Sequence, residues 1–171
     1  MSARIVIQVV AFFGYLLLQA LVLRNFVLFD SSFCLAYIGF LLLLPIETSV
    51  IWLLLLGFAM GIGVDIFYDS IGIHAFASVF IMFVRNYWIN LLTPQGGYDL
   101  GAVPSLALDG WQWFLSYALP LVFLHHLVLF FTEAAGFHLF SFTLVKVLGS
   151  TLFTFLFLLI LQYFFYTKRK R

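Results

Sequence analysis

The chain has 171 residues, of which 65% are hydrophobic and only 9% are charged, and its formal net charge is +1. Soluble globular domains carry about 25% charged residues, so these few charges cannot cover a water-facing surface. The composition therefore predicts an all-α integral membrane protein. Because the only run of basic residues is 168–171, at the end of the chain, nucleic-acid binding is not expected.

Six apolar segments predict a bundle of six transmembrane helices in a single domain. In chain order they are 5–23, 33–46, 49–67, 73–92, 112–133 and 141–166. About 20 residues are needed to cross a bilayer, because a helix rises 1.5 Å per residue. The first segment is too long for a secretory signal and is expected to be retained as a span. The second is short and contains Pro45, with Glu47 close behind, so it is either a short span or one arm of a re-entrant hairpin.

The placement of lysine and arginine predicts the orientation of this bundle. With six spans both termini lie on one side, and Arg4, Arg85 and the tail 168–171 then outnumber Arg24 and Lys146 on the other. Since cytoplasmic loops carry an excess of these residues, both termini are expected in the cytoplasm.

Two further features are expected to be structural. The longest connection, residues 93–110, is rich in Gly and Pro and should be an irregular cytoplasmic loop. The single cysteine, Cys34, excludes an internal disulfide and lies in an apolar run. It is expected to be a small buried hydrophobe.

Polar residues and glycines gather where the third span ends and the fourth begins. The candidate residues are Gly57, Gly61, Asp65, Asp69, Ser70, Gly72 and His74, with Lys146 near the same membrane face. Asp65 and Asp69 are four residues apart and share a helix face if the helix continues. Asp69 and Ser70 suit a turn and an N-cap, Gly72 supplies backbone conformations that other residues resist, and His74 begins the next helix.

This polar patch has three interpretations. Asp65, Asp69 and His74 could supply mixed oxygen and nitrogen ligands to a divalent cation, although no fourth ligand is evident. The two aspartates faintly resemble the motifs of aspartyl intramembrane proteases, but a dyad that shares a proton needs opposed carboxylates. In the favoured interpretation, the acids and the histidine cap, turn and pair the helix ends. No catalytic residue, metal or cofactor is then expected.

Charged residues inside the spans should have partners, because an isolated charge in lipid costs several kcal/mol. Asp65 and Lys146 lie at similar depth and form the expected ion pair. Arg85 lies about 16 Å deeper than the start of its helix, so Glu47 is its expected partner.

A second group of polar residues, His125, His126, Glu133 and His138, lies further along the chain. His126 and Glu133 are seven residues apart and share a helix face, which would be compatible with a zinc site. The stretch has no pair of histidines four residues apart. Histidines that are hydrogen-bonded within the bundle are therefore favoured.

The stretch GFAMGIGVDIFYDSIGIHAFASVFIMFVR, residues 57–85, resembles the signature of the rod shape-determining MreD family. The matching positions are Gly61, Asp65, Ser70, Gly72, His74 and Ala75. The rest of the chain agrees in kind, with a second span broken by proline, six spans in a short chain and a basic C-terminus. The stretches LPIET, NLLTPQGGYD and HHLVLFFTE are similar to members from Bacteroidetes-type bacteria.

This resemblance implies a non-enzymatic scaffold of the cell-elongation complex in the bacterial inner membrane, required for rod cell shape. Such a protein lies beside the bitopic protein MreC and links the MreB filament to the peptidoglycan synthases. The family is also similar in architecture to the substrate-binding subunits of energy-coupling-factor vitamin transporters. A solute-binding subunit of such a transporter is therefore the alternative.

Under the scaffold hypothesis the protein acts by association and not by turnover. Gly57 and Gly61 have the spacing that lets a second helix approach closely, and this face is expected to pack against a partner's transmembrane helix. The outer polar patch is expected to orient the part of MreC outside the membrane, so Asp65→Ala and His74→Ala should weaken co-purification. The sequence leaves open the oligomeric state and whether an outer cavity binds a lipid or a lipid-linked precursor.

Overall fold

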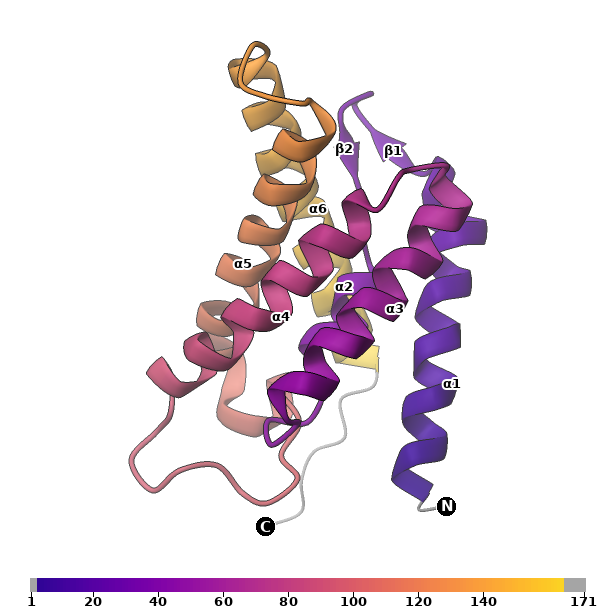
Figure 1. The fold of residues 1–171 in the computed structure, drawn as a ribbon. Helices are drawn as coiled ribbons and strands as arrows, with labels where there is room; N and C mark the ends of the chain where they lie inside the picture. Colours follow the sequence, from indigo (N-terminus) through magenta and orange to yellow (C-terminus); the bar gives the residue numbers. More distant parts are fainter. Residues whose placement is uncertain (1–2, 165–171) are drawn as a thin grey trace.

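The computed structural model describes residues 3–164 and shows an almost entirely helical bundle (Figure 1). In chain order its elements are α1 (Ala3–Leu17), β1 (Val27–Leu28), β2 (Ser32–Phe33), α2 (Tyr37–Leu42), α3 (Val50–Tyr68), α4 (Ile73–Leu91), α5 (Leu106–Glu133) and α6 (Phe140–Phe164). A π-helical turn, Leu18–Val22, and a 3₁₀ turn, Leu23–Asn25, continue α1. The two strands form a small antiparallel hairpin.

Within the described part of the chain, four helices are long and apolar enough to cross a membrane. They are Ile5–Asn25, Val50–Tyr68, Gly110–Glu133 and Phe140–Phe164. Four of the six predicted spans are therefore confirmed by length and composition. The segment 73–92 forms α4, which has 19 residues but includes polar side chains such as His74 and Arg85 and is less apolar. The segment 33–46 forms only the six-residue α2.

The two ends of the bundle differ in what they contain (Figure 1). At one end, the terminal end, α1 begins and α6 finishes, and residues 92–105 connect α4 to α5. At the other, the hairpin end, lie the turns of β1–β2, α3–α4 and α5–α6. The connection at the terminal end is irregular, as predicted, but shorter, because α5 starts at Leu106. The basic tail 168–171, on which the predicted orientation depends, lies outside the described residues.

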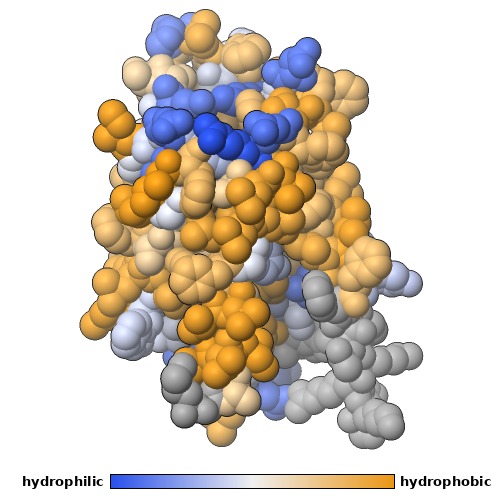
Figure 2. Space-filling model, turned by 90° about the vertical axis from the view of Figure 1, so that its right-hand side faces the viewer, coloured by the Kyte–Doolittle hydropathy of each residue, from blue (hydrophilic) through white to orange (hydrophobic). Residues whose placement is uncertain are grey.

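The outer surface suits a lipid environment. Figure 2 shows apolar side chains over the middle of one face, with polar side chains gathered in a band near the hairpin end. Large apolar residues are exposed along α1, α3 and α6, the outer helices of the bundle. Water would not tolerate this much apolar surface, whereas the hydrocarbon of a bilayer matches it.

The chain enters α2 as an extended segment inside the bundle, and side chains of α6 supply its hydrogen bonds. The Phe33 N–H donates to Ser150 Oγ (2.9 Å), and the Leu35 N–H donates to Thr154 Oγ1 (2.9 Å). Buried N–H groups away from water must be paired, and an extended segment cannot pair them within itself. Cys34, in the middle of this segment, is 1% exposed, which confirms the prediction of a buried cysteine.

Gln19 from the π-helical turn completes the start of α2. Its Nε2 donates to the carbonyl of Cys34 (3.1 Å), and its Oε1 accepts from the N–H of Tyr37 (3.3 Å). The first N–H groups of a helix have no partner inside the helix. Gln19 therefore caps α2 from another element.

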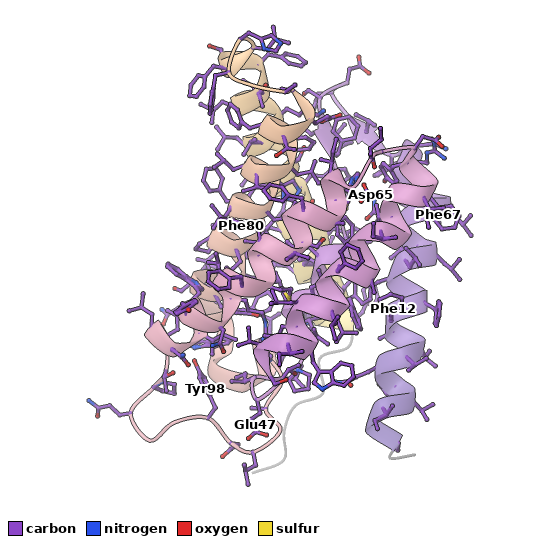
Figure 3. The ribbon with its side chains drawn as sticks, viewed as in Figure 1. Phe12, Glu47, Asp65, Phe67, Phe80 and Tyr98 are labelled. Atoms are coloured by element: carbon purple, nitrogen blue, oxygen red, sulfur yellow. The ribbon has the colours of Figure 1, made fainter. Side chains whose placement is uncertain are left out.

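Arg85 caps the opposite end of α2 and does not pair with Glu47, as had been predicted. Its fully buried guanidinium donates to the carbonyl of Leu44 and, through Nε, to the hydroxyl of Tyr117 (2.8 Å). That hydroxyl in turn donates to the carbonyl of Leu42 (2.7 Å). Glu47 is exposed at the terminal end (Figure 3). The last carbonyl groups of a buried helix need hydrogen-bond donors, and Arg85 and Tyr117 supply them.

Candidate functional site

The carboxylate of Asp65 is the centre of the candidate site, between α3 and α4 at the hairpin end (Figure 3). Asp65 is only 4% exposed. Its Oδ1 accepts hydrogen bonds from Ser70 Oγ (2.6 Å) and from the His74 N–H (3.0 Å), and its Oδ2 accepts from the Ala75 N–H (3.0 Å). His74 and Ala75 are the second and third residues of α4. Asp65 therefore caps the N-terminus of α4 from the end of α3.

The turn between α3 and α4 explains why this cap comes from another helix. The residue that precedes α4 is Gly72, which has no side chain to accept a hydrogen bond. Gly72 has a φ of 75°, a left-handed conformation that glycine adopts without strain. The turn brings Asp65 over the start of α4, where the positive end of the helix dipole also favours a carboxylate.

The imidazole of His74 belongs to the same network. Its Nδ1 lies 3.0 Å from Asp65 Oδ1 and 3.0 Å from Ser70 Oγ. An ionised carboxylate only accepts hydrogen bonds, so Nδ1–H is the donor to Asp65. The rings of Tyr37 and Tyr68 pack edge-on against the imidazole, with centroids 5.9 Å and 5.0 Å away. These contacts hold the ring in one orientation.

Gly57 and Gly61 let α3 and α4 approach closely. A Cβ atom at Gly61 would lie 2.6 Å from the backbone nitrogen of Ala75 and 2.7 Å from the carbonyl oxygen of His74. A Cβ atom at Gly57 would lie 3.1 Å from the carbonyl oxygen of Ser78. The expectation that this face binds a partner's transmembrane helix is wrong, because α4 of the same chain occupies it.

Asp69 is separate from the Asp65 network. Its side chain is 86% exposed and pairs with Arg24 at 3.3 Å. Asp65, Asp69 and His74 therefore do not converge, and the two carboxylates do not oppose each other. Within residues 3–164, no group of three or more His, Cys, Asp or Glu side chains is arranged to hold a metal ion.

Lys146 pairs with Glu133 and not with Asp65, so the predicted Asp65–Lys146 pair is wrong. Lys146 Nζ lies 2.6 Å from Glu133 Oε2. It also lies 4.8 Å and 4.4 Å from the ring centroids of Phe33 and Phe130, within the range of cation–π attraction. Both oxygens of Asp65 are already bonded within the α3–α4 joint.

A small pocket of about 110 Å³ brings part of the predicted set together. Ser70, His74, Glu133 and Lys146 are among its lining residues. Pockets that bind small organic ligands are usually about 300–1,000 Å³ in volume, so this one is small. Asp65, which is hydrogen-bonded to His74, is not among the residues that line the pocket.

The histidines of α5 are hydrogen-bonded inside the bundle, as predicted. His125 Nε2 lies 2.8 Å from the hydroxyl of Tyr37. His126 Nδ1 lies 2.7 Å from the carbonyl of Val122, and its Nε2 lies 3.1 Å from Thr154 Oγ1. Because Glu133 is bonded to Lys146, it does not join His126 in a zinc site.

The sequence interpretation missed the polar residues that support α2. Ser150 and Thr154 are four residues apart in α6, so they share one face of this largely apolar helix. This spacing could have indicated a polar stripe directed at a neighbouring segment. The position of Gln19 gave no comparable signal, because it is a single polar residue in an apolar run.

Comparison of the chain with protein-family models, with curated proteins and with solved structures found no match. The resemblance of residues 57–85 to the MreD signature therefore stays a prediction from the residues themselves.

Proposed function

We propose that this chain is a non-enzymatic membrane scaffold of the bacterial cell-elongation complex, of the MreD type. It would act with MreC, the MreB filament and peptidoglycan synthases to organise lateral wall synthesis and rod cell shape. The proposal includes an inner-membrane location, six crossings and both termini in the cytoplasm. The alternating direction of α1, residues 33–46, α3, α4, α5 and α6 supports six crossings (Figure 1).

The observation that carries this proposal is how the signature residues are used. The residues are Gly61, Asp65, Ser70, Gly72, His74 and Ala75, and all of them lie in the joint between α3 and α4. Both oxygens of Asp65 accept hydrogen bonds from this joint. A carboxylate used in this way stabilises a fixed shape, which is what a scaffold needs.

The rigid joint presents an exposed apolar residue at the hairpin end. Ile71, in the α3–α4 turn, is 99% exposed. Phe29 in the β1–β2 turn and Phe137 in the α5–α6 turn are exposed at the same end. These three residues, one in each turn, are together named the hairpin-end apolar surface. Aromatic residues are enriched in protein interfaces, and the proposal assigns this surface to the part of MreC outside the membrane.

The alternative function, a solute-binding transporter subunit, has less support. Such a subunit needs a pocket of solute size at the outer face. The described pocket at the hairpin end has about 110 Å³, against about 300–1,000 Å³ for typical ligand sites. Lys146, which could have bound an anionic solute, is bonded to Glu133.

The proposal is tested by recovery of MreC with the tagged chain after mild detergent extraction. Ile71→Ser should reduce recovery about fivefold, the loss expected for about 1 kcal/mol of binding energy. Leu100→Ser is the matched control, because Leu100 is 92% exposed and lies at the terminal end. It should recover MreC as the wild type does.

Two results would contradict the proposal. If the wild-type chain recovers no MreC, the scaffold function is wrong, and recovery of an ATPase pair would support the transporter alternative. If Ile71→Ser, Phe29→Ser and Phe137→Ser all recover MreC normally, the assigned surface is wrong.

A further inference from the structure

Helix α1 is attached to the bundle mainly at its C-terminal half. Gln19, just after α1, is fully buried; it donates to the hydroxyl of Tyr68 (2.6 Å) and accepts from the first N–H of α2. A Cβ atom at Gly63 of α3 would lie only 3.0 Å from the side chain of Leu16, so the two helices are in close contact there. Tyr15 lies equally close to Gly39 of α2. These contacts attach α1 to α2 and α3 in the part of the helix that lies nearer the hairpin end.

Towards the terminal end α1 separates from α3 and leaves a groove. The ribbon shows the two helices diverging (Figure 1), and Phe12 points into the space between them (Figure 3). The groove has a volume of about 600 Å³. We name it the α1 groove and define it by six of its lining residues, Val9, Phe12, Phe40, Leu44, Trp52 and Leu56.

A second, smaller groove lies on the other flank of α1. It has about 230 Å³ and shares Gln8, Phe40 and Leu44 with the α1 groove. The two spaces therefore share part of their walls beneath α1. In the N-terminal half of α1, Phe12 contacts Phe40 of α2, and open space remains on both flanks of the helix.

The charge of the walls restricts what can fill the α1 groove. Among the described residues that line it, none is Asp, Glu, Lys, Arg or His. Its polar lining residues are Gln8 and Thr48. Burying a charge against uncharged walls is costly, so the complementary occupant is an uncharged apolar group.

The volume of the groove favours a lipid chain over a transmembrane helix of another protein as its occupant. One turn of an α-helix, 5.4 Å long and 10–12 Å wide, occupies about 500 Å³. The groove could therefore hold little more than one turn, whereas a span requires about five. An empty apolar groove of this size would lose its packing contacts, and the bilayer supplies hydrocarbon chains to fill it.

We propose that the α1 groove binds a single hydrocarbon chain of a membrane lipid. The chain enters sideways from the bilayer and packs beneath the N-terminal half of α1. Trp52, near the start of α3, lines the groove and is largely exposed. Tryptophan prefers the level of the lipid head groups, so the lipid belongs to the leaflet at the terminal end. This proposal does not depend on the scaffold function.

Two neighbouring valines of α1 give a matched test. Val9 lines the groove, whereas Val10 lines neither groove and is 66% exposed. The protein is reconstituted in vesicles of phosphatidylethanolamine and phosphatidylglycerol with a phospholipid that carries a photoreactive diazirine on one acyl chain. Wild-type protein should label mainly on peptides from α1, α2 and the first half of α3. Val9→Trp should reduce this labelling about tenfold, and Val10→Trp should change it less than about twofold.

Native mass spectrometry of the detergent-purified protein is the second measurement. A bound lipid at one copy per chain is expected for the wild type and Val10→Trp, and its loss is expected for Val9→Trp. If Val9→Trp does not fold, Ala59→Phe fills the same groove from α3. Equal lipid retention in groove-filling and control variants, or labelling spread evenly over the lipid-facing helices, would overturn the proposal. Recovery of MreC should be unchanged by Val9→Trp, which separates this test from that of the scaffold.

Discussion

Asp65 and Asp69 lie one helical turn apart, yet their surroundings differ in every respect that matters for stability. Asp65 is buried and accepts hydrogen bonds from Ser70 and two backbone N–H groups of α4. Asp69 is exposed, and its side chain pairs with Arg24. Exposed ion pairs contribute about 0–1 kcal/mol, whereas a buried carboxylate that caps a helix contributes more.

The change Asp65→Asn should therefore lower the stability by about 2 kcal/mol, because an amide cannot accept all of these hydrogen bonds. For a chain of this size the loss corresponds to about 6 °C in melting temperature. Asp69→Asn is the matched control and should shift it by less than about 2 °C. Thermal unfolding in detergent, followed by circular dichroism, measures both. A larger effect at Asp69 would contradict the assignment of the cap.

Gly61 and Gly14 are both helical glycines in candidate spans, but only Gly61 lies against another helix. Gly61→Ala should destabilise the protein by about 1–3 kcal/mol, because the new methyl group meets the backbone of α4. Gly14→Ala should stabilise it by up to about 1 kcal/mol, because no atom lies within 4 Å and alanine favours the helix. Detergent melting curves of the two variants should move in opposite directions. Shifts of both melting temperatures in the same direction would contradict the inference that a side chain at position 61 disrupts the α3–α4 contact.

At the scale of elements, α2 and the extended residues before it depend on side chains from other helices. Thr154 and Thr151 are both buried in α6, one turn apart. Thr154 Oγ1 accepts the Leu35 N–H and contacts His126, whereas Thr151 Oγ1 has no partner in the described structure. The two threonines therefore separate the effect of a hydrogen bond from that of burial.

Replacement of these threonines by valine, which has the same shape, should give opposite results. Thr154→Val leaves a buried N–H group unpaired and should cost about 1–3 kcal/mol. Thr151→Val removes an unpaired hydroxyl and should be neutral or stabilising. Hydrogen exchange at the amide of Leu35 is the more specific readout and should speed up only in Thr154→Val. Unchanged exchange at Leu35 would contradict the proposed support of α2.

The sequence predicts the long helices better than it predicts α2 or the ion pairs. A stretch of 19 or more residues with high mean hydropathy predicts a spanning helix, as in α3 and α6. The segment 33–46 is too short for its periodicity to separate a helix from an extended chain, and only Pro45 hinted at a break. The prediction that Lys146 pairs with Asp65 was wrong because depth along a helix does not reveal the direction of a side chain. The sequence favoured Asp69 and Ser70 for the cap, and Asp65 caps α4 instead because the turn folds the end of α3 over the start of α4.

At the scale of the whole molecule, the α3–α4 turn and the connection between α4 and α5 lie at opposite ends of the bundle (Figure 1). The variants Ile71→Cys and Leu100→Cys place thiols at two almost fully exposed sites, one at each end. The native Cys34 is buried and should not react. In intact spheroplasts a membrane-impermeant maleimide should label Ile71→Cys at once and Leu100→Cys only after permeabilisation. Labelling of both from outside would contradict the proposed orientation.

The buried guanidinium of Arg85 has a consequence for biosynthesis. α4 is less apolar than the four candidate spans, and its arginine is accommodated by carbonyls of the segment that contains α2 and by Tyr117 of α5. When α4 leaves the ribosome the carbonyl groups already exist, whereas Tyr117 has yet to be translated. We therefore expect the Sec translocon to retain α2 and α3 until α4 arrives, and to release them into the lipid together. In a variant that lacks residues 37–49, so that the chain passes directly into α3, α4 should fail to integrate into the membrane.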